Sequence, residues 1–323
     1  MMRQFSIVLL FLFQISIVAQ QTNGLLNYKD FTSYKLIWEN DVMFQTDYYY
    51  TQGLAMELIH SHFQKNPVNH LFFFNKFNTN KQVYGISLHQ QMFTPLDIKK
   101  ENILYGDRPY AGLLYLKSFS KSANTEKKYL IKSELDIGLI GPSSLADITQ
   151  YKFHEISDNH LPNGWINQIK QVPIINYNVS YYKGIYETNS STFMAYGRGR
   201  IGSLYDDIQL GIEYRFGYLN SFFETIGEDT YLKSNKWQAY LTLSPNLTFV
   251  GYNATLQGNV FKKNHQTYII RPDDIERVVY GFDGSASIIF KGVGISYQLN
   301  FQSPEFRDGL HHLFHSTSFI FRF

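Results

Sequence analysis

Polar side chains from separate segments of the chain form a set that could activate water for hydrolysis. Asn40 and Asp41 are adjacent, Thr51 follows shortly after Asp47, and His154 lies further along the chain. An imidazole with an ordinary pKa near ~6.5 can accept a proton at ambient pH. Carboxylate, amide and hydroxyl oxygens are ligands for a hard cation, which can polarise a carbonyl. A zinc site would need more His or Cys nearby.

Each of these residues also has an ordinary structural interpretation. An Asn-Asp pair at a strand end can form a turn, and Arg108 before a proline can simply fix a loop. His154 alone on a helix can be a surface or packing residue. Ser143 and Ser144 leave a serine mechanism open, although no nucleophile-elbow pattern surrounds either. The case for a site depends on the elements that bring these segments together.

The elements that carry these residues follow a period of two. From Tyr129 to Ile140 an apolar face alternates with a charged one that includes Lys132, Glu134 and Asp136. Such segments are about ten residues long and are separated by turns rich in Asn, Lys, Ser and Gly, as in tilted membrane strands. Counting them predicts an all-β fold, an antiparallel transmembrane β-barrel of about 12 strands. The final alternating strand ends at Phe323, as in the assembly signal of outer-membrane barrels.

The N-terminus and the composition narrow the class of protein. Residues 1–19 combine Arg3 with an apolar run and a small residue, Ala19, which predicts a signal peptide ahead of a barrel domain over residues 20–323. The chain has no Cys, so neither disulfides nor thiolate metal sites contribute. With 29 Lys and Arg against 27 Asp and Glu, no basic face argues for nucleic acid.

A periplasmic N-terminus would place three connections outside the cell. These connections span residues 41–49, 94–109 and 141–171. The longest predicts a short helix at 144–156, with Ser144 as its N-cap and Asp147 as a capping-box partner. Asp147, Gln150 and His154 then share one helix face. The polar clusters therefore converge on one rim of the barrel.

Several motifs, in one order along the chain, resemble the LpxR lipid A deacylase family. They are Trp38-Glu-Asn-Asp41, Thr46-Asp47 with Tyr50-Thr51-Gln52-Gly53, Asp107-Arg-Pro-Tyr-Ala-Gly112, Gly138-Leu-Ile-Gly-Pro142, Gln150 followed by His154, and Gly164-Trp165 followed by Gln168. The resemblance covers somewhat under half of the chain, and the C-terminal half matches only as barrel strands. Spaced motifs in one order are more specific than any single motif.

The resemblance implies a calcium-dependent, 12-stranded outer-membrane barrel that removes the 3′-acyloxyacyl chain from lipid A. His154 would be the general base, Asn40 and Asp41 would hold the site and its Ca²⁺, Thr51 would line it as a further ligand, and Gln150 would sit beside His154. The family also has a functional lysine after its third strand. Lys99 and Lys100 both follow Phe93-Thr94-Pro95 here, and Lys100 is slightly favoured.

These expectations place the protein in the outer membrane with its site facing the cell exterior. Its partners would be the membrane and the lipid A of lipopolysaccharide in the outer leaflet, and it would act as a monomer. Lys99, Lys100 and Arg108 could pair with lipid phosphates, or could belong to solvated loops. The alternatives are a non-catalytic barrel, as a pore or scaffold, and an outer-membrane phospholipase.

Overall fold

The protein is a closed antiparallel β-barrel, described here from a computed structural model. The structure describes residues 32–44, 46–227, 237–258 and 267–322, so the predicted signal peptide and Phe323 lie outside the described residues. Each strand pairs with its neighbours in the sequence, and β1 (Thr32–Asn40) pairs with β12 (His312–Arg322) to close the ring. The predicted all-β barrel of about 12 strands is confirmed.

The remaining elements are long strands joined by short helices. The other strands are β2 (Tyr49–His60), β3 (Lys81–Thr94), β4 (Ala111–Asn124), β5 (Tyr129–Ile140), β6 (Val172–Glu187), β7 (Ser191–Gly202), β8 (Tyr205–Tyr218), β9 (Trp237–Asn253), β10 (Val278–Phe290) and β11 (Val293–Gln302). The α-helices are α2 (Ala146–Ser157) and α3 (Ala254–Gln257). Among the residues that the structure describes, no helix is long and apolar enough to cross a membrane.

The alternation in β5 shows how the sequence builds the wall. Ile137 points outward and is 53% exposed, while Glu134 and Asp136 point inward and are buried. β5 has 12 residues, and a tilted strand of this length rises about 28 Å, close to the ~30 Å hydrocarbon core of a bilayer. An apolar outer face and a polar inner face are the pattern expected of a barrel whose wall meets lipid.

Paired charges fill much of the lumen, as the sequence indicates. Lys117 and Lys132 both contact Glu134, with N–O distances of 2.9 and 2.7 Å. Further along the lumen, Arg200 forms an ion pair with Asp207. The space left includes two cavities of about 290 and 320 Å³, both lined partly by Arg198.

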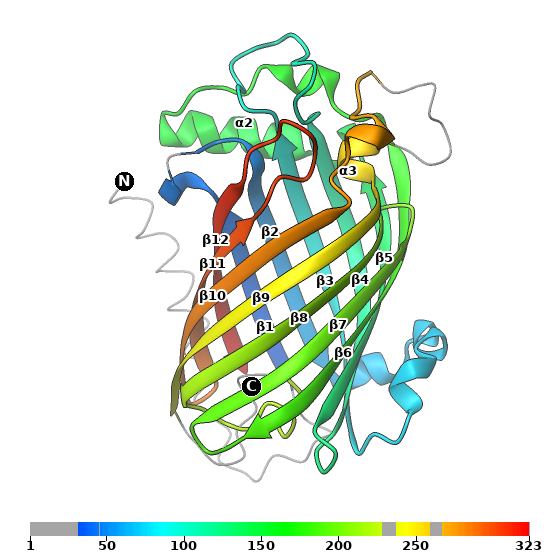
Figure 1. Cartoon of the computed structure of the whole chain (residues 1–323), viewed down its shortest axis with the longest axis vertical. Coiled ribbons are helices and arrows are strands. Elements are labelled where there is room, and N and C mark those ends of the chain that lie inside the picture. Colours follow the sequence, from blue (N-terminus) through cyan, green and yellow to red (C-terminus); the bar gives the residue numbers. More distant parts are fainter. Residues whose placement is uncertain (1–31, 45, 228–236, 259–266, 323) are drawn as a thin grey trace.

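The two ends of the barrel differ. Figure 1 shows α2 and α3 at one end and the C-terminus at the other. The end with the helices carries the long connections between β3 and β4 and between β5 and β6. At the opposite end, the connection between β2 and β3 forms three 3-10 helices, η3 (Ser61–Lys65), η4 (Pro67–Leu71) and η5 (Phe73–Lys76), which lie beside the barrel.

The helix predicted at 144–156 is present as α2, but its predicted capping is wrong. Leu145 is the N-cap, has a left-handed conformation with φ 58°, and makes no side-chain cap. Ser144 belongs to a preceding 3-10 turn, and Asp147 binds the adjacent Ile148 amide instead. The 3-10 turn brings the chain sharply back over the wall, so the helix begins after the predicted cap.

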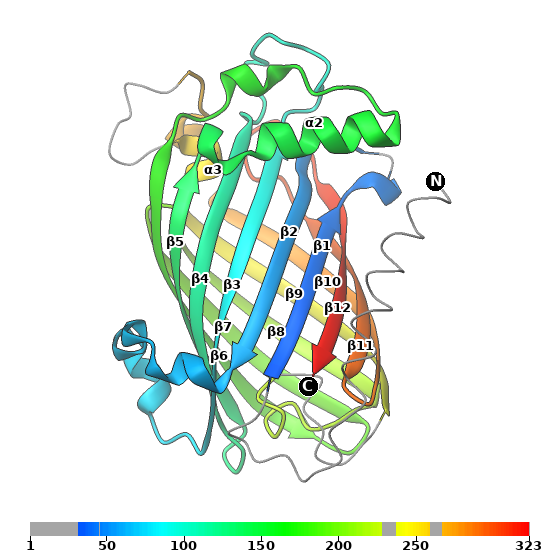
Figure 2. The ribbon, with the colours of Figure 1, turned by 180° about the vertical axis from the view of Figure 1, so that it is seen from behind.

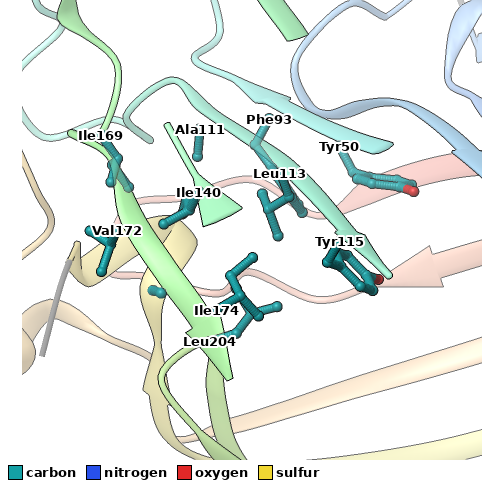
Figure 3. Close-up of a cluster of buried hydrophobic side chains, with 11 residues drawn as sticks. Tyr50, Phe93, Ala111, Leu113, Tyr115, Ile140, Ile169, Val172, Ile174 and Leu204 are labelled. Atoms are coloured by element: carbon teal, nitrogen blue, oxygen red, sulfur yellow. The ribbon is translucent and has the colours of Figure 1, made fainter. Parts of the chain in front are cut away.

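An apolar cluster inside the barrel supports the strand ends near α2. It includes Tyr50, Phe93, Leu113, Tyr115 and Ile174, which come from β2, β3, β4 and β6 (Figure 3). These side chains are all at most 8% exposed. Burial of several large side chains at one level holds these strand ends in a fixed arrangement.

Candidate active site

The residues predicted at the ends of β1 and β2 lie on the outer face of the wall. Asn40 follows the lumen-facing Glu39 and therefore points outward. Its Nδ2 donates to the Thr51 carbonyl at 3.0 Å, and its Oδ1 accepts from the Val42 amide at 2.7 Å. Thr51 Oγ1 donates to the Met92 carbonyl at 3.4 Å, beside an irregularity in the pairing of β2 with β3. The structure thus brings Asn40 and Thr51 into contact.

Asp41 is a buried carboxylate at the start of the β1–β2 connection. It is 2% exposed, and its Oδ2 accepts from Thr46 Oγ1 at 3.0 Å and from the Tyr48 amide at 3.2 Å. Burial, together with the nearby charge of Asp47, raises the pKa of Asp41 to about 8. The β1–β2 connection therefore holds two acidic groups, Asp41 and Asp47, that repel each other when both are ionised.

Helix α2 covers this part of the wall. Figure 2 shows it lying across the ends of β2, β3 and β4 on the outside of the barrel. Its buried residues are Ala146, Gln150 and His154, which recur at helical spacing and face the wall. Ala146 packs with Met92, Tyr110 and Trp165 in a small apolar cluster under the helix.

Gly112 permits the close approach of α2 to β4. A Cβ at this position would lie 2.3 Å from Ser144 Oγ and 2.5 Å from Ala146 Cβ. Either distance is far below van der Waals contact, so any larger residue would push the start of α2 outward. The position of Gln150 and His154 over the wall therefore depends on this glycine.

His154 is held at both ring nitrogens. Nδ1 donates to the His160 carbonyl at 2.5 Å, and Nε2 lies 3.6 Å from Asp47 Oδ2. A carbonyl can only accept, so Nδ1 carries the hydrogen and the neutral ring leaves Nε2 as the basic nitrogen. The imidazole is 4% exposed, and the Asp47 carboxylate is positioned to stabilise a positive charge on it.

Gln150 lies one turn before His154 and is 1% exposed. Its Oε1 accepts from Trp165 Nε1 at 2.7 Å, which fixes the orientation of the amide. No described residue accepts a hydrogen bond from its buried Nε2. A buried donor without a partner is costly, so this amide is suited to bind an oxygen of a substrate.

The oxygen atoms around Asp41 fit a hard cation. Two mutually repelling carboxylates, Asp41 and Asp47, are what a divalent ion would relieve. Asn40 Oδ1 and Thr51 Oγ1 each have lone pairs beyond the hydrogen bonds described above. Among the described residues, no group of three His, Cys, Asp or Glu side chains could hold a metal, so the fit rests on amide and hydroxyl oxygens as well.

The structure adds Asp47 to the residues singled out in the sequence. The sequence places Asp47 in a matching motif but gives no sign that it faces His154 from more than a hundred residues away. The one signal in the sequence for a role of Asp47 is its position in the connection that leads to Thr51. Burial raises the pKa of Asp47, whereas the charges of His154 and His160 lower it.

The basic residues predicted to bind phosphate differ in where they lie. Lys100 is 59% exposed at its side chain and lies 3.4 Å from Asp97, so it is a surface residue outside the contacts that join His154 to the wall. Lys99 is also exposed, and its carbonyl binds Asn163 at 3.0 Å. Arg108 is instead buried against Glu305 and Thr255. The suggestion that Arg108 pairs with lipid phosphates is therefore wrong for this structure.

The two candidate nucleophilic serines lie at the other end of α2 from His154. Ser143 is exposed and bonds Gln171, and Ser144 is buried beneath the helix start, where its Oγ accepts from the Ala146 amide at 3.4 Å. His154 is two helical turns further along, with its ring nitrogens toward His160 and Asp47. This arrangement does not favour a Ser-His pair.

Comparison with known proteins identifies a family and several solved structures with a similar fold. A family model described as outer membrane protein LpxR matches residues 5–323. The structure of LpxR from Salmonella typhimurium is 19% identical, with a TM-score of 0.74, and the match covers 90% of this chain and 100% of that one. The COG4313 outer membrane channel from Pseudomonas putida F1 is 8% identical, with a TM-score of 0.44 and coverage of 94% and 98%. No relative was found among curated protein sequences.

Proposed function

The chain belongs to the LpxR family of outer membrane proteins, and on that premise we propose that it hydrolyses the 3′-linked acyloxyacyl ester of lipid A. One observation carries the proposal. The buried His154 imidazole pairs with the partly exposed Asp47 carboxylate near the ends of β1 and β2, where Asn40, Asp41 and Thr51 lie, on the outer wall of the barrel rather than in its lumen. A site there meets a lipid directly, without extracting it from the membrane.

His154 is the proposed general base. Its Nε2 is the unprotonated nitrogen, because Nδ1 donates to the His160 carbonyl. Nε2 takes a proton from water as the water attacks the ester carbonyl. The imidazolium then donates this proton to the leaving alcohol oxygen as the ester C–O bond breaks. The Asp47 carboxylate stabilises the imidazolium formed between these steps.

Asp41, Asn40 and Thr51 are the proposed calcium ligands, with Asp47 close enough to contribute charge. When bound, Ca²⁺ would polarise the ester carbonyl. Gln150 Nε2 is the proposed donor to the oxyanion, since it is buried, oriented by Trp165 and without a described acceptor.

The position of the site supports an outward orientation. Three connections at the end with the C-terminus, β4–β5, β6–β7 and β10–β11, are short turns, as on the periplasmic side of outer-membrane barrels, whereas the β3–β4 and β5–β6 connections at the other end are long. The proposal places α2 and the site at the outer leaflet, where lipopolysaccharide lies, and has residues 1–19 direct export. Lys99 and Lys100, both exposed, are the proposed contacts for lipid phosphates, and the barrel is proposed to act as a monomer.

The test is lipid analysis after expression in a host whose lipid A structure is known. Loss of mass equal to the 3′-acyloxyacyl chain, dependent on His154, would support the proposal. Release of fatty acid from glycerophospholipids would instead indicate a phospholipase. Unchanged lipids with a folded barrel, with calcium present, would indicate a non-catalytic scaffold or pore.

A further inference from the structure

The outer wall of the barrel is interrupted by a polar patch far from the candidate site. Ser118, Ser120 and Ser122 on β4 alternate outward, and Ser133 on β5 pairs with Ser120. The same face of β4 carries Leu116, which is 48% exposed as expected of a lipid-facing residue. Hydroxyl groups facing hydrocarbon without partners would be costly. Another segment of the chain must therefore cover this serine patch, which consists of Ser118, Ser120, Ser122 and Ser133.

The connection between β2 and β3 is that cover. Asn75 in η5 is 1% exposed, and its Nδ2 donates to the Ser120 carbonyl at 2.9 Å and to Ser122 Oγ at 3.0 Å. The Ser133 hydroxyl donates to Asn75 Oδ1. Ahead of it, Asn66 Nδ2 lies 3.3 Å from Ser118 Oγ. These hydrogen bonds hold residues 61–80 against the outside of the wall. Figure 2 shows this segment beside the barrel at the lower left.

The face that this segment turns away from the wall is aromatic. Phe73, Phe74 and Phe77 are 53%, 41% and 63% exposed, and Leu71 is 46% exposed. Four large apolar side chains on one short segment are unusual at a surface that meets only water. At the end of a membrane barrel, aromatic residues typically lie at the boundary between lipid and water.

This aromatic face continues the lipid-facing surface of the strands. Tyr177 of β6 stacks on Phe73 at 6.3 Å between ring centroids, and its hydroxyl donates to the Leu71 carbonyl at 2.8 Å. Tyr129 of β5 donates to the Phe77 carbonyl at 2.8 Å. Both tyrosines are on the outward faces of their strands, so the segment and the wall form one continuous surface.

The charges of the segment favour contact with a lipid leaflet over contact with another protein, whose surface would carry charges of both signs. Residues 61–80 contain no Asp or Glu, while His62, Lys65 and His70 are exposed. The Lys65 cation beside an aromatic face, with no acidic group in the segment, matches the phosphates and the acyl boundary of a phospholipid leaflet.

We propose that residues 61–80 are a membrane-interface anchor that inserts its Phe face into the phospholipid leaflet at the barrel end opposite α2. The segment covers the serine patch with Asn75 and presents Phe73, Phe74 and Phe77 to lipid in its place. This inference concerns a surface remote from His154, so it stands or fails independently of the proposed reaction.

Because the chain has no Cys, single nitroxide labels can test the depth of each residue. Phe73→Cys and Phe77→Cys are compared with Gln64→Cys, an exposed polar position of the same segment, and with Leu116→Cys on the lipid-facing wall. Each labelled barrel is reconstituted in vesicles of phosphatidylethanolamine and phosphatidylglycerol. Relaxation by oxygen, which concentrates in lipid, is compared with relaxation by a water-soluble nickel chelate.

The labels at 73 and 77 are expected to favour oxygen over nickel by several-fold relative to Gln64→Cys, approaching the behaviour of Leu116→Cys. Nickel accessibility equal to that at Gln64 would overturn the proposal. Spin–spin broadening that scales with protein density would also overturn it, since it would assign the face to a second copy.

A second variant tests how the segment is held. Asn75→Ala should increase the mobility and the nickel accessibility of a label at 77, because the contacts to Ser120, Ser122 and Ser133 are lost. Asn69→Ala is the control, since its amide binds only the segment's own carbonyls at Phe63 and Gln64. A label unaffected by Asn75→Ala in a heat-modifiable barrel would contradict the role of Asn75.

Discussion

His154 Nε2 and Asp47 Oδ2 lie 3.6 Å apart, although their residues come from connections separated by four strands, β2 to β5. One residue belongs to a helix laid over the outer wall, and the other to the turn between the first two strands. The pair exists only when the helix is seated on the wall. The contact between His154 and Asp47 therefore depends on the position of the helix.

Replacement of His154 tests the proton acceptor. His154→Ala should lower ester hydrolysis by roughly 10² or more, the usual effect of losing a general base. His154→Gln should not restore it, because an amide can bond but cannot take the proton. Lipid A deacylation is measured in each variant beside a heat-modifiability assay for the folded barrel. Near-normal rates in His154→Ala, with loss in Ser143→Ala, would transfer the chemistry to a hydroxyl.

Asp47→Asn tests the carboxylate opposite that imidazole. The change keeps the size of the side chain but removes the charge that stabilises the imidazolium, so the rate should fall at least about tenfold, or about 1.4 kcal/mol in the barrier. Single-turnover rates at saturating lipid separate this effect from weaker binding. Asp158→Asn on the exposed end of α2 is the control, and its rate should not change. An unaltered rate in Asp47→Asn would show that His154 acts without help from the Asp47 carboxylate.

Removal of calcium tests the proposed cation. Excess chelator should abolish deacylation, and added Ca²⁺ should restore it, because the buried oxygens of Asp41, Asn40 and Thr51 are hard ligands. Asp41→Ala should raise the calcium concentration needed or abolish the reaction. Asp97→Ala, a surface carboxylate paired with Lys100, is the matched control. Full activity in chelator would remove the cation from the mechanism.

Gly112→Ala tests the seating of α2. The added methyl would approach Ser144 and Ala146 too closely, so the helix should shift outward by a fraction of an ångström or more. A displacement on the order of 1 Å can cost 10²-fold in rate. Gly199→Ala in β7, where a Cβ would meet nothing within 4 Å, is the control and should be silent. Equal rates in the two variants would show that the helix tolerates the change.

The sequence predicts the barrel well because alternation is a local property. Each strand, such as Tyr129 to Ile140, shows its two faces within its own residues, and the strand order follows from neighbours pairing in turn. The contact of Asn40 with Thr51 is likewise predictable, because both flank one short connection.

Contacts across long loops could not be predicted in the same way. Nothing within residues 142–148 signals that Leu145 replaces Ser144 as the cap, because a left-handed residue there depends on the wall beneath. Arg108 resembles a surface cation in the sequence, yet it is buried against Glu305 and Thr255. Glu305 lies in the connection before β12, and Thr255 lies in α3, directly after β9. Only closure of the barrel brings these two segments to Arg108.

Closure of the ring has a consequence for the timing of activity. Asn40 stands opposite His315, so the strand that presents Asn40 and Asp41 is also one side of the seam where the first and last strands meet. Until that seam forms, β1 has a free edge, and Asn40 is aligned on one side alone, opposite Gln52 of β2. A partly folded barrel would therefore lack half of the strand pairing that positions Asn40 and Asp41 in the proposed site, and we expect hydrolysis to begin only with the last step of folding.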